Sequence, residues 1–379
     1  MYWSWRRKFA AFAVLLFGAS SFYAQSQSPK VLKLNLEDYG WHPLPKEQRG
    51  EWGGTRSRLV SIDHLGRVLV GFTVRENFSL ATREKSGLSF HILRFTPDGK
   101  VDLSLVLPTN SFFTNGLYLG PNDQIFARAN GTLQLMSEEG GPRKEGADWR
   151  SLVLCPKNCS ISQSPSRRTL TVDTYSKEMS DPEYDRGIRT NSMLDASSTP
   201  PRVVKDCSGA IITDKFSYQS SDGISTDVLR RPLCDQGHGV ELPLDMRGGV
   251  VRALNDEVLL LLGTGKERRG VELVAPDGQI KFRQEMPKHD VVDGNWESSD
   301  ERGDRFAFIV ETWRGGSSIL DISGKRVARR IEVYTDTGQE LGSIPVSTIY
   351  RREFDFSLSS DGHRLAILDE GVVTVVDMQ

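Results

Sequence analysis

The chain has 379 residues, of which 38% are hydrophobic, a share that excludes an intrinsically disordered or fibrous protein. Its 48 lysines and arginines are matched by 50 aspartates and glutamates. This balance argues against a protein that grips the phosphate backbone of nucleic acid. The length suits two ordinary domains or one large repeat fold.

Residues 1–26 predict a signal peptide. Residues 6–8 (Arg-Arg-Lys) are basic, residues 9–17 are apolar, and small residues follow. The apolar stretch is shorter than the roughly 20 residues that a membrane-spanning helix needs. Residues 22–24 lengthen it, so an uncleaved anchor is the alternative, and the arginine pair leaves a twin-arginine route open. We expect cleavage, export to the periplasm or the medium, and no membrane insertion of the mature chain.

From residue 27 onward the chain predicts many short strands. Apolar residues alternate with polar ones, or form short runs that Gly, Asp, Asn and Ser interrupt. A longer unit recurs at intervals of roughly 40 to 60 residues. Its seven copies begin near Val60, Leu117, Ile161, Ile211, Arg252, Trp296 and Phe356.

Asp-Gly turns, or looser turn sequences that also contain glycine, divide the units into antiparallel strands, because glycine accepts a positive φ without steric cost. Four-stranded units of this length are typical of β-propeller blades. The turns at residues 97–99 and 276–278 (Pro-Asp-Gly) and 360–362 (Ser-Asp-Gly) resemble those of TolB-type and NHL-type propellers. We therefore expect an all-β fold, a single propeller domain over residues 27–379 with seven four-stranded blades. A pair of β-sandwiches is the alternative.

The two ends of the mature chain predict how the ring closes. The last unit stops after its third strand, at residues 372–376, and lacks a fourth. Residues 31–36 (Val-Leu-Lys-Leu-Asn-Leu) alternate with period two and belong to no other unit. We expect this segment to pair with the last strand and cover its exposed edge.

Four cysteines in an exported chain favour disulfides. The local choice pairs Cys155 with Cys159 and Cys207 with Cys234. A metal site at the first pair is the alternative, although no second pair with zinc spacing follows. The second pairing conflicts with the expected strands, which place its cysteines at opposite ends of one blade, whereas bridged Cα atoms lie within about 7 Å. Either this pairing or the strand assignment there is wrong.

The resemblance to propellers implies a binding surface on one face. Loops that enter the inner strands and loops that join the second strand to the third share this face, here called the loop face. The longest such loops are expected at residues 37–56, 75–87, 286–295 and 313–330. Aromatic residues beside arginines suit a binding surface, and the candidates are Trp41, His42, Trp52, Arg56, Trp313, Arg314, Arg351 and Arg352. We expect a monomer that recognises a protein, peptide or glycan through these loops.

The runner-up function is a propeller hydrolase or lyase. His289 lies beside Asp290 and close to Asp293, and a carboxylate can orient a histidine as a general base or help to hold a divalent cation. Motifs of zinc proteases, serine hydrolases and dinucleotide-binding enzymes are absent. The sequence identifies no cofactor.

Overall fold

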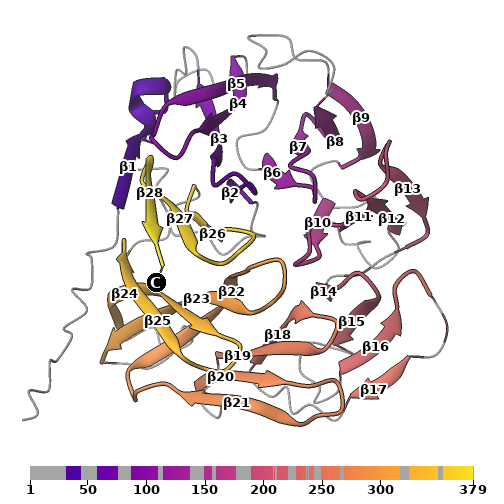
Figure 1. The fold of residues 1–379 in the computed structure, drawn as a ribbon, viewed down its shortest axis with the longest axis vertical. Helices are drawn as coiled ribbons and strands as arrows, with labels where there is room; N and C mark the ends of the chain where they lie inside the picture. Colours follow the sequence, from indigo (N-terminus) through magenta and orange to yellow (C-terminus); the bar gives the residue numbers. More distant parts are fainter. Residues whose placement is uncertain are drawn as a thin grey trace, which may run out of the picture.

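The computed structural model is a ring of seven four-stranded antiparallel sheets (Figure 1). It describes residues 31–43, 58–75, 87–109, 114–136, 149–155, 159–175, 189–207, 209, 211–220, 228–235, 237, 239–242, 249–264, 269–315, 324–348 and 353–378. Each sheet is one blade, and the blades follow one another around the ring in chain order. The seven-bladed propeller expected from the repeats is confirmed.

The first three blades each consist of four consecutive strands. Blade one has β2 (Val60–Ile62), β3 (Val68–Arg75), β4 (Leu88–Phe95) and β5 (Val101–Pro108). Blade two has β6 (Gly116–Leu119), β7 (Ile125–Ala129), β8 (Thr132–Met136) and β9 (Trp149–Leu154). Blade three has β10 (Cys159–Gln163), β11 (Thr169–Tyr175), β12 (Arg189–Asp195) and β13 (Arg202–Lys205).

Blades four to six have the same plan. Blade four has β14 (Ile211–Ile212), β15 (Phe216–Ser220), β16 (Val228–Pro232) and β17 (Val240–Leu242). Blade five has β18 (Gly249–Asn255), β19 (Val258–Thr264), β20 (Arg269–Val274) and β21 (Ile280–Glu285). Blade six has β22 (Asp290–Ser299), β23 (Arg305–Arg314), β24 (Lys325–Thr335) and β25 (Glu340–Val346).

Blade seven contains both ends of the described chain. Its strands β26 (Asp355–Leu358), β27 (Arg364–Asp369) and β28 (Val372–Asp377) come from the C-terminus, and β1 (Val31–Asn35) supplies the outer strand. The register runs antiparallel from Val31 opposite Val376 to Asn35 opposite Val372. The predicted closure of the ring by the N-terminal strand is therefore confirmed. A short 3-10 helix, η1 (Leu36–Tyr39), follows β1.

The core lies between the blades. Strands β19 and β23 show the pattern most clearly, because residues 258–263 of β19 and residues 306–311 of β23 are all buried. Phe306, Phe308 and Tyr334 stack on one another with ring planes 20° apart and centroids 5.6–6.0 Å apart. Their cluster includes Leu260 and Leu262 of blade five, so it joins two neighbouring sheets.

Turns that join the first and second strands lie around the face opposite the loop face, here called the turn face. In blade one the N–H of Asp63 donates to the carbonyl of Arg67 and the N–H of Gly66 to that of Asp63, and most blades repeat this pattern. Each blade is bonded to the next along this face, through the pairs His64–Asp123, Gln163–Leu119, Ser166–Asp214, Lys215–Asp256, Asn255–Arg302, Glu301–Ser360 and Arg364–Gly66. The face is thus tied into a continuous ring.

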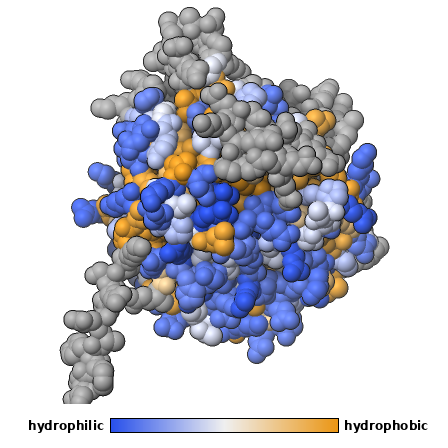
Figure 2. Space-filling model, turned by 45° about the horizontal axis from the view of Figure 1, so that its top comes forward, coloured by the Kyte–Doolittle hydropathy of each residue, from blue (hydrophilic) through white to orange (hydrophobic). Residues whose placement is uncertain are grey.

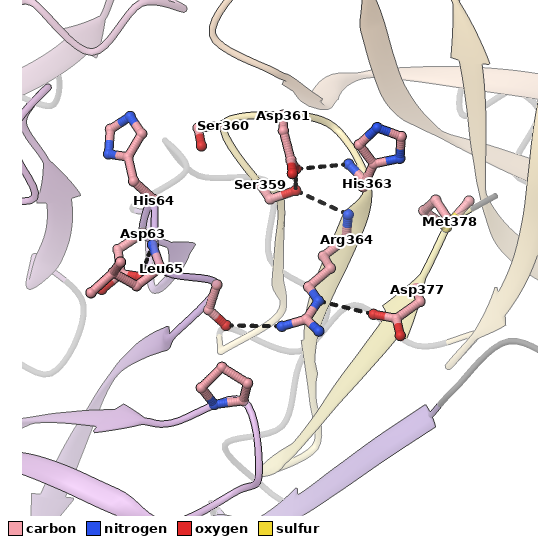
Figure 3. A pocket seen from close by; sticks show the side chains of 12 residues that line it. Asp63, His64, Leu65, Ser359, Ser360, Asp361, His363, Arg364, Asp377 and Met378 are labelled. Atoms are coloured by element: carbon pink, nitrogen blue, oxygen red, sulfur yellow. Dashed lines mark hydrogen bonds and ion pairs between the residues drawn. The ribbon is translucent and has the colours of Figure 1, made fainter.

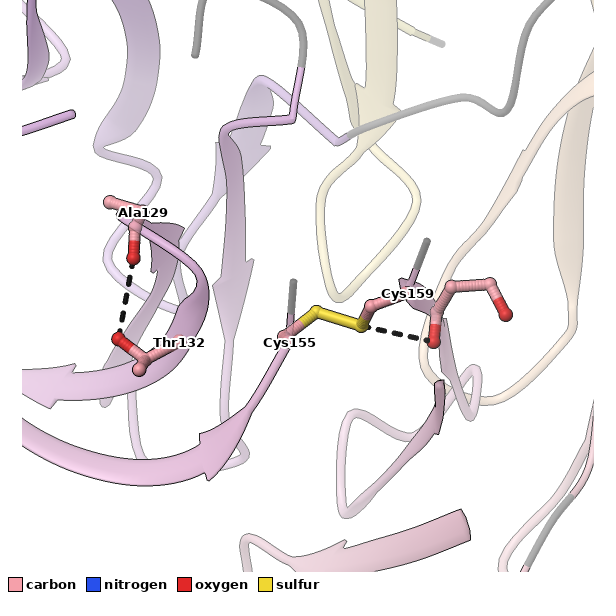
Figure 4. The surroundings of a disulfide bond; sticks show 5 residues. Ala129, Thr132, Cys155 and Cys159 are labelled. Carbon is pink, nitrogen blue, oxygen red and sulfur yellow. Dashed lines mark hydrogen bonds between the residues drawn. A yellow bond between two sulfur atoms is a disulfide. The ribbon is translucent and has the colours of Figure 1, made fainter. Parts of the chain in front are cut away.

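Two disulfides connect neighbouring blades. Cys155 follows β9 and Cys159 begins β10, so their bond fastens blade two to blade three (Figure 4). Cys207 follows β13 and bonds to Cys234, which follows β16, with 4.4 Å between the Cα atoms. The pairing is the local one. Cys207 also precedes the inner strand β14 and Cys234 follows the third strand β16, as the sequence placed them. The pairing and the strand assignment therefore hold together, and the expected conflict between them was wrong.

Two of the expected loops contain strand residues. Strand β22 begins at Asp290, inside the predicted loop 286–295. Strand β23 ends at Arg314 and β24 begins at Lys325, both inside the predicted loop 313–330. Three residues bulge out of β22 between Asp293, opposite Ile309, and Glu297, opposite Phe308. This bulge interrupts the alternation from which the inner strand was placed near Trp296. No helix among the described residues is long and apolar enough to cross a membrane.

Candidate functional site

Trp41 packs inside the protein instead of lining a binding surface. The side chain is 5% exposed, and its indole N–H donates to the carboxylate of Glu353. Its ring lies against Gly371, whose φ is +75° and where a Cβ atom would come within 2.3 Å of the ring. Trp41 therefore fastens the closing segment to the β27–β28 turn.

Trp313 belongs to a buried charged cluster at the loop-face end of blade six. Its indole N–H donates to Glu311 at 3.1 Å, and Arg326 lies over its ring while donating to the same carboxylate at 2.9 Å. Arg329 is also buried, with its guanidinium 4.4 Å from the centre of the Phe354 ring. Burial raises the pKa of Glu311 and lowers that of Arg329 to about 10. The bond from Arg326 of β24 to Glu311 of β23 joins two strands of this blade.

The three catalytic candidates lie at the start of β22. His289 is exposed, whereas Asp290 and Asp293 are buried. The carboxylate of Asp290 accepts hydrogen bonds from the hydroxyl of Thr312 and from Arg330, both at 2.7 Å. Asp290 is thus engaged by blade six itself. A catalytic role for His289 stays a prediction.

The other loop-face candidates divide into two groups. His42 and Arg314 are exposed. Trp52, Arg56, Arg351 and Arg352 lie outside the described residues. Their proposed part in ligand binding stays a prediction.

A first charged cluster links inner strands from four blades. Arg58, just before β2, donates to the carbonyls of Phe356 and Glu297 at 3.2 and 3.1 Å. The carboxylate of Glu297 accepts a hydrogen bond from Arg252 of blade five at 2.8 Å. Asp355 of blade seven accepts from two backbone N–H groups of blade one. Opposite charges meet here in pairs, so the cluster locks blades five, six, seven and one together.

A second charged cluster, the axial cluster, lies at the turn face and comprises His64, Asp123, Arg167 and Glu301. The two ring nitrogens of His64 lie 2.8 Å from Asp123 and 3.2 Å from Glu301. Arg167 lies 3.3 Å from Glu301 and donates to the carbonyl of Ile62 at 2.8 Å. Because blades three and six lie on opposite sides of the ring, the Arg167–Glu301 contact crosses the central axis.

The neighbouring carboxylates favour the charged form of His64. Burial opposes protonation of His64, but the hydrogen bond to Asp123 and the charge of Glu301 outweigh it, so the pKa of His64 is raised. Protonated His64 and Arg167 then balance the two carboxylates. With both ring nitrogens engaged, His64 acts as a clamp between blades one, two and six.

The backbone of the axial cluster is strained at two positions. The residue that ends the inner turn has a positive φ in five blades, and in three of them it is glycine: Gly66, Gly303 and Gly362. Blades two and three instead have Asp123 (φ 59°) and Arg167 (φ 62°) there. A side chain in this conformation costs of order 1 kcal/mol or more. Asp123 contacts His64, and Arg167 contacts Glu301.

A pocket of about 460 Å³ opens beside the axial cluster, between blades one and seven (Figure 3). Its lining comes from the inner turns of both blades, from Pro97 and from the end of β28; it consists of Asp63, His64, Leu65, Gly66, Pro97, Ser359, Ser360, Asp361, His363, Arg364, Asp377 and Met378. Arg364 spans its floor, donating to Asp377 at 2.9 Å and to the carbonyl of Gly66 at 3.3 Å. The pocket is thus formed where the closing strand completes the ring.

Leu65 is the exposed apolar group of this pocket, with 67% of its surface accessible. Most other large apolar side chains that are exposed in the described part of the chain lie on outer strands, one to a blade, as in Val31, Leu154, Val203, Val240 and Ile280. In the view of Figure 2 hydrophobic residues gather in one band above a mostly hydrophilic surface. An exposed leucine on an inner turn therefore stands apart from the edge-strand pattern.

Asp361 carries the negative charge of the pocket. Burial opposes its ionisation, but hydrogen bonds from the Ser359 hydroxyl (2.6 Å) and the His363 N–H (3.0 Å) outweigh it and lower its pKa. Both donors are neutral, and the charge of the His363 side chain also lowers this pKa. The other carboxylates of the lining face arginines, Asp63 with Arg67 at 2.6 Å and Asp377 with Arg364.

Sequence reasoning placed the binding surface on the loop face and missed this pocket. The inner turns were interpreted only as tight hairpins, because Asp-x-x-Gly is an ordinary turn pattern. One signal was present: residues 123 and 167 break the glycine pattern of the turns.

Comparisons with known proteins find similar folds only. No family model and no curated protein matches the chain. Among solved structures it is similar to the WD40 domain of Toxoplasma gondii coronin, with 10% identity over 92% of this chain and 86% of that one and a TM-score of 0.49. The C-terminal WD40 domain of Sif2 gives 9% identity over 86% and 99% and a TM-score of 0.44. Kuenenia stuttgartiensis hydrazine synthase gives 11% identity over 88% and 99% and a TM-score of 0.45.

Proposed function

We propose that this chain is an exported binding or scaffolding propeller that recognises a protein or peptide through the pocket on its turn face. The open pocket between blades one and seven, with Leu65 exposed at its rim, carries the proposal. Leu65, Pro97 and Met378 give it apolar surface, and Ser360 and Asp361 add polar groups, the mixture that protein interfaces use. Its twelve described residues include no tryptophan, tyrosine or phenylalanine, so a peptide suits it better than a glycan.

The contacts of His64 and Asp290 suit binding better than catalysis. His64 holds a carboxylate on each ring nitrogen, and Asp290 is engaged by Thr312 and Arg330. A general base needs a free ring nitrogen or carboxylate oxygen within reach of its substrate. The Asp-Gly turns resemble those of TolB-type and NHL-type blades, and the proposal includes placing the chain in that class of propellers.

Site-specific photo-cross-linking in the native host tests the proposal. A photoreactive residue replaces Leu65 at the pocket, Asp277 elsewhere on the turn face, or Arg314 on the loop face; all three positions are exposed. We expect a discrete cross-linked partner from position 65 alone. A partner captured only from position 314 would move the binding surface to the loop face. No cross-link from any position would overturn the binding function.

Fractionation of the same cells tests export. We expect the cross-linked protein in the periplasmic or secreted fraction, shortened by the length of the signal peptide. Full-length protein in the membrane fraction would show an uncleaved anchor, and protein in the cytoplasm would refute export.

A further inference from the structure

We propose that the turn-face pocket binds a peptide segment in which an apolar side chain packs against Leu65, Pro97 and Met378 while a nearby lysine or arginine faces Asp361. The inference rests on the proposed function and names the class of ligand. The exposed side chain of Leu65 and the negative charge of Asp361, which meet in this pocket, carry it.

Two of the three aspartates in the lining face arginines, whereas Asp361 has the side chain of His363 as its charged neighbour. Asp63 is neutralised by Arg67, Asp377 by Arg364, and Asp123 and Glu301 by protonated His64 together with Arg167. Asp361 remains with neutral donors on one carboxylate oxygen. A cationic side chain of a ligand would supply a positive charge, with a charge-assisted hydrogen bond as the contact.

Two of the apolar lining residues, Met378 and Pro97, are held in place by the backbone. Met378 is 7% exposed, and its N–H donates to the carbonyl of His363, which holds it at the end of β28. Pro97 begins the β4–β5 turn and is rigid by its ring. An apolar side chain that entered here would shield Leu65 from water, and this burial is the main favourable term in such contacts.

Titration of methyl-labelled methionine by NMR tests the inference with defined probes. The probes are acetyl-Gly-Leu-Lys-Gly-amide, the same peptide with lysine one position further on, and versions with glutamine or glutamate in place of lysine. We expect the Met378 methyl signal to shift with the leucine–lysine peptides and the Met286 signal of blade five to stay in place. Met378→Leu assigns the signal.

Two variants separate the apolar and charged contacts. Asp361→Asn keeps the acceptor for Ser359 and His363, so the turn remains intact. We expect it to raise the dissociation constant of the lysine peptide about threefold, the range of a partly exposed ion pair, without affecting the glutamine peptide. Leu65→Ser weakens both peptides. The control Asp98→Asn, on an exposed turn of the same face, changes neither.

The outcomes distinguish this inference from the function on which it rests. Equal binding of the lysine and glutamine peptides, or tighter binding of the glutamate peptide, would overturn the basic ligand class. If no peptide shifts Met378 while the cross-link from position 65 persists, the pocket binds a partner of other chemistry. Loss of both results would refute the binding function itself.

Discussion

Leu36 determines how firmly the N-terminal strand closes the ring. Its side chain is completely buried, and its N–H donates to the carbonyl of Gly371 at 2.8 Å. Truncating a buried leucine to alanine costs about 2–5 kcal/mol, and a residue with no exposed surface lies in the upper half of that range. Val31, on the same strand, is 50% exposed, so Val31→Ala is a matched control with an expected cost below about 0.5 kcal/mol.

Thermal unfolding followed by circular dichroism measures both variants. We expect Leu36→Ala to lower Tm by roughly 5–10 °C, because a protein of this size loses a few degrees per kcal/mol, and Val31→Ala to leave it nearly unchanged. Deleting residues 29–37 should lower Tm further, since it also exposes the edge of β28. Equal melting temperatures for all of these proteins would refute closure of the ring by this strand.

Three further predictions concern pH and covalent links. The pKa of His64 is raised by folding, so protonated His64 stabilises the fold fully below pH 6.5, and this stability is lost as pH rises through the folded pKa. In calorimetry the Tm difference between wild type and His64→Gln should therefore shrink between pH 6 and 9. A Tm difference that stays constant would contradict the clamp. Burial raises the pKa of Asp300 to about 6, so the free energy of unfolding falls as pH rises from 4 to 6. Asp300→Asn should therefore stabilise the protein by up to about 3 kcal/mol at pH 7.5 but not near pH 4. Replacing Cys207 and Cys234 by serine should lower the free energy of unfolding in urea by about 3–4 kcal/mol, against about 2 kcal/mol for Cys155 and Cys159. The Cys207–Cys234 bond closes a loop of 27 residues and the Cys155–Cys159 bond one of 4, and a longer closed loop restricts the unfolded chain more. A larger loss for the Cys155–Cys159 pair would contradict this reasoning.

The sequence was sufficient for the architecture because the repeat is encoded locally. Alternating strands recur in each blade and Asp-Gly turns in several, and six inner strands were placed within a few residues of their observed starts. The seventh, β22, was placed near Trp296 although it begins at Asp290, because the bulge after Asp293 shifts the alternation. The ends of the chain predicted ring closure for the same local reason.

The candidate site was beyond sequence reasoning because its residues meet only when the ring closes. His64 and Glu301 are 237 residues apart, and Arg167 reaches Glu301 across the axis. Nothing in a single turn reveals such partners. Trp41 was expected at a binding surface on residue type alone, whereas its neighbour Gly371, which leaves room for its ring, is distant in sequence.

A crystal structure of the protein with acetyl-Gly-Leu-Lys-Gly-amide tests the central claim most directly. We predict electron density for the leucine side chain against Leu65 and Met378 and for the lysine ammonium beside Asp361. The same crystals grown with Asp361→Asn should show the leucine but not the ordered lysine. Density at the loop face beside His289 or Arg314, with the turn-face pocket filled by water, would contradict the claim.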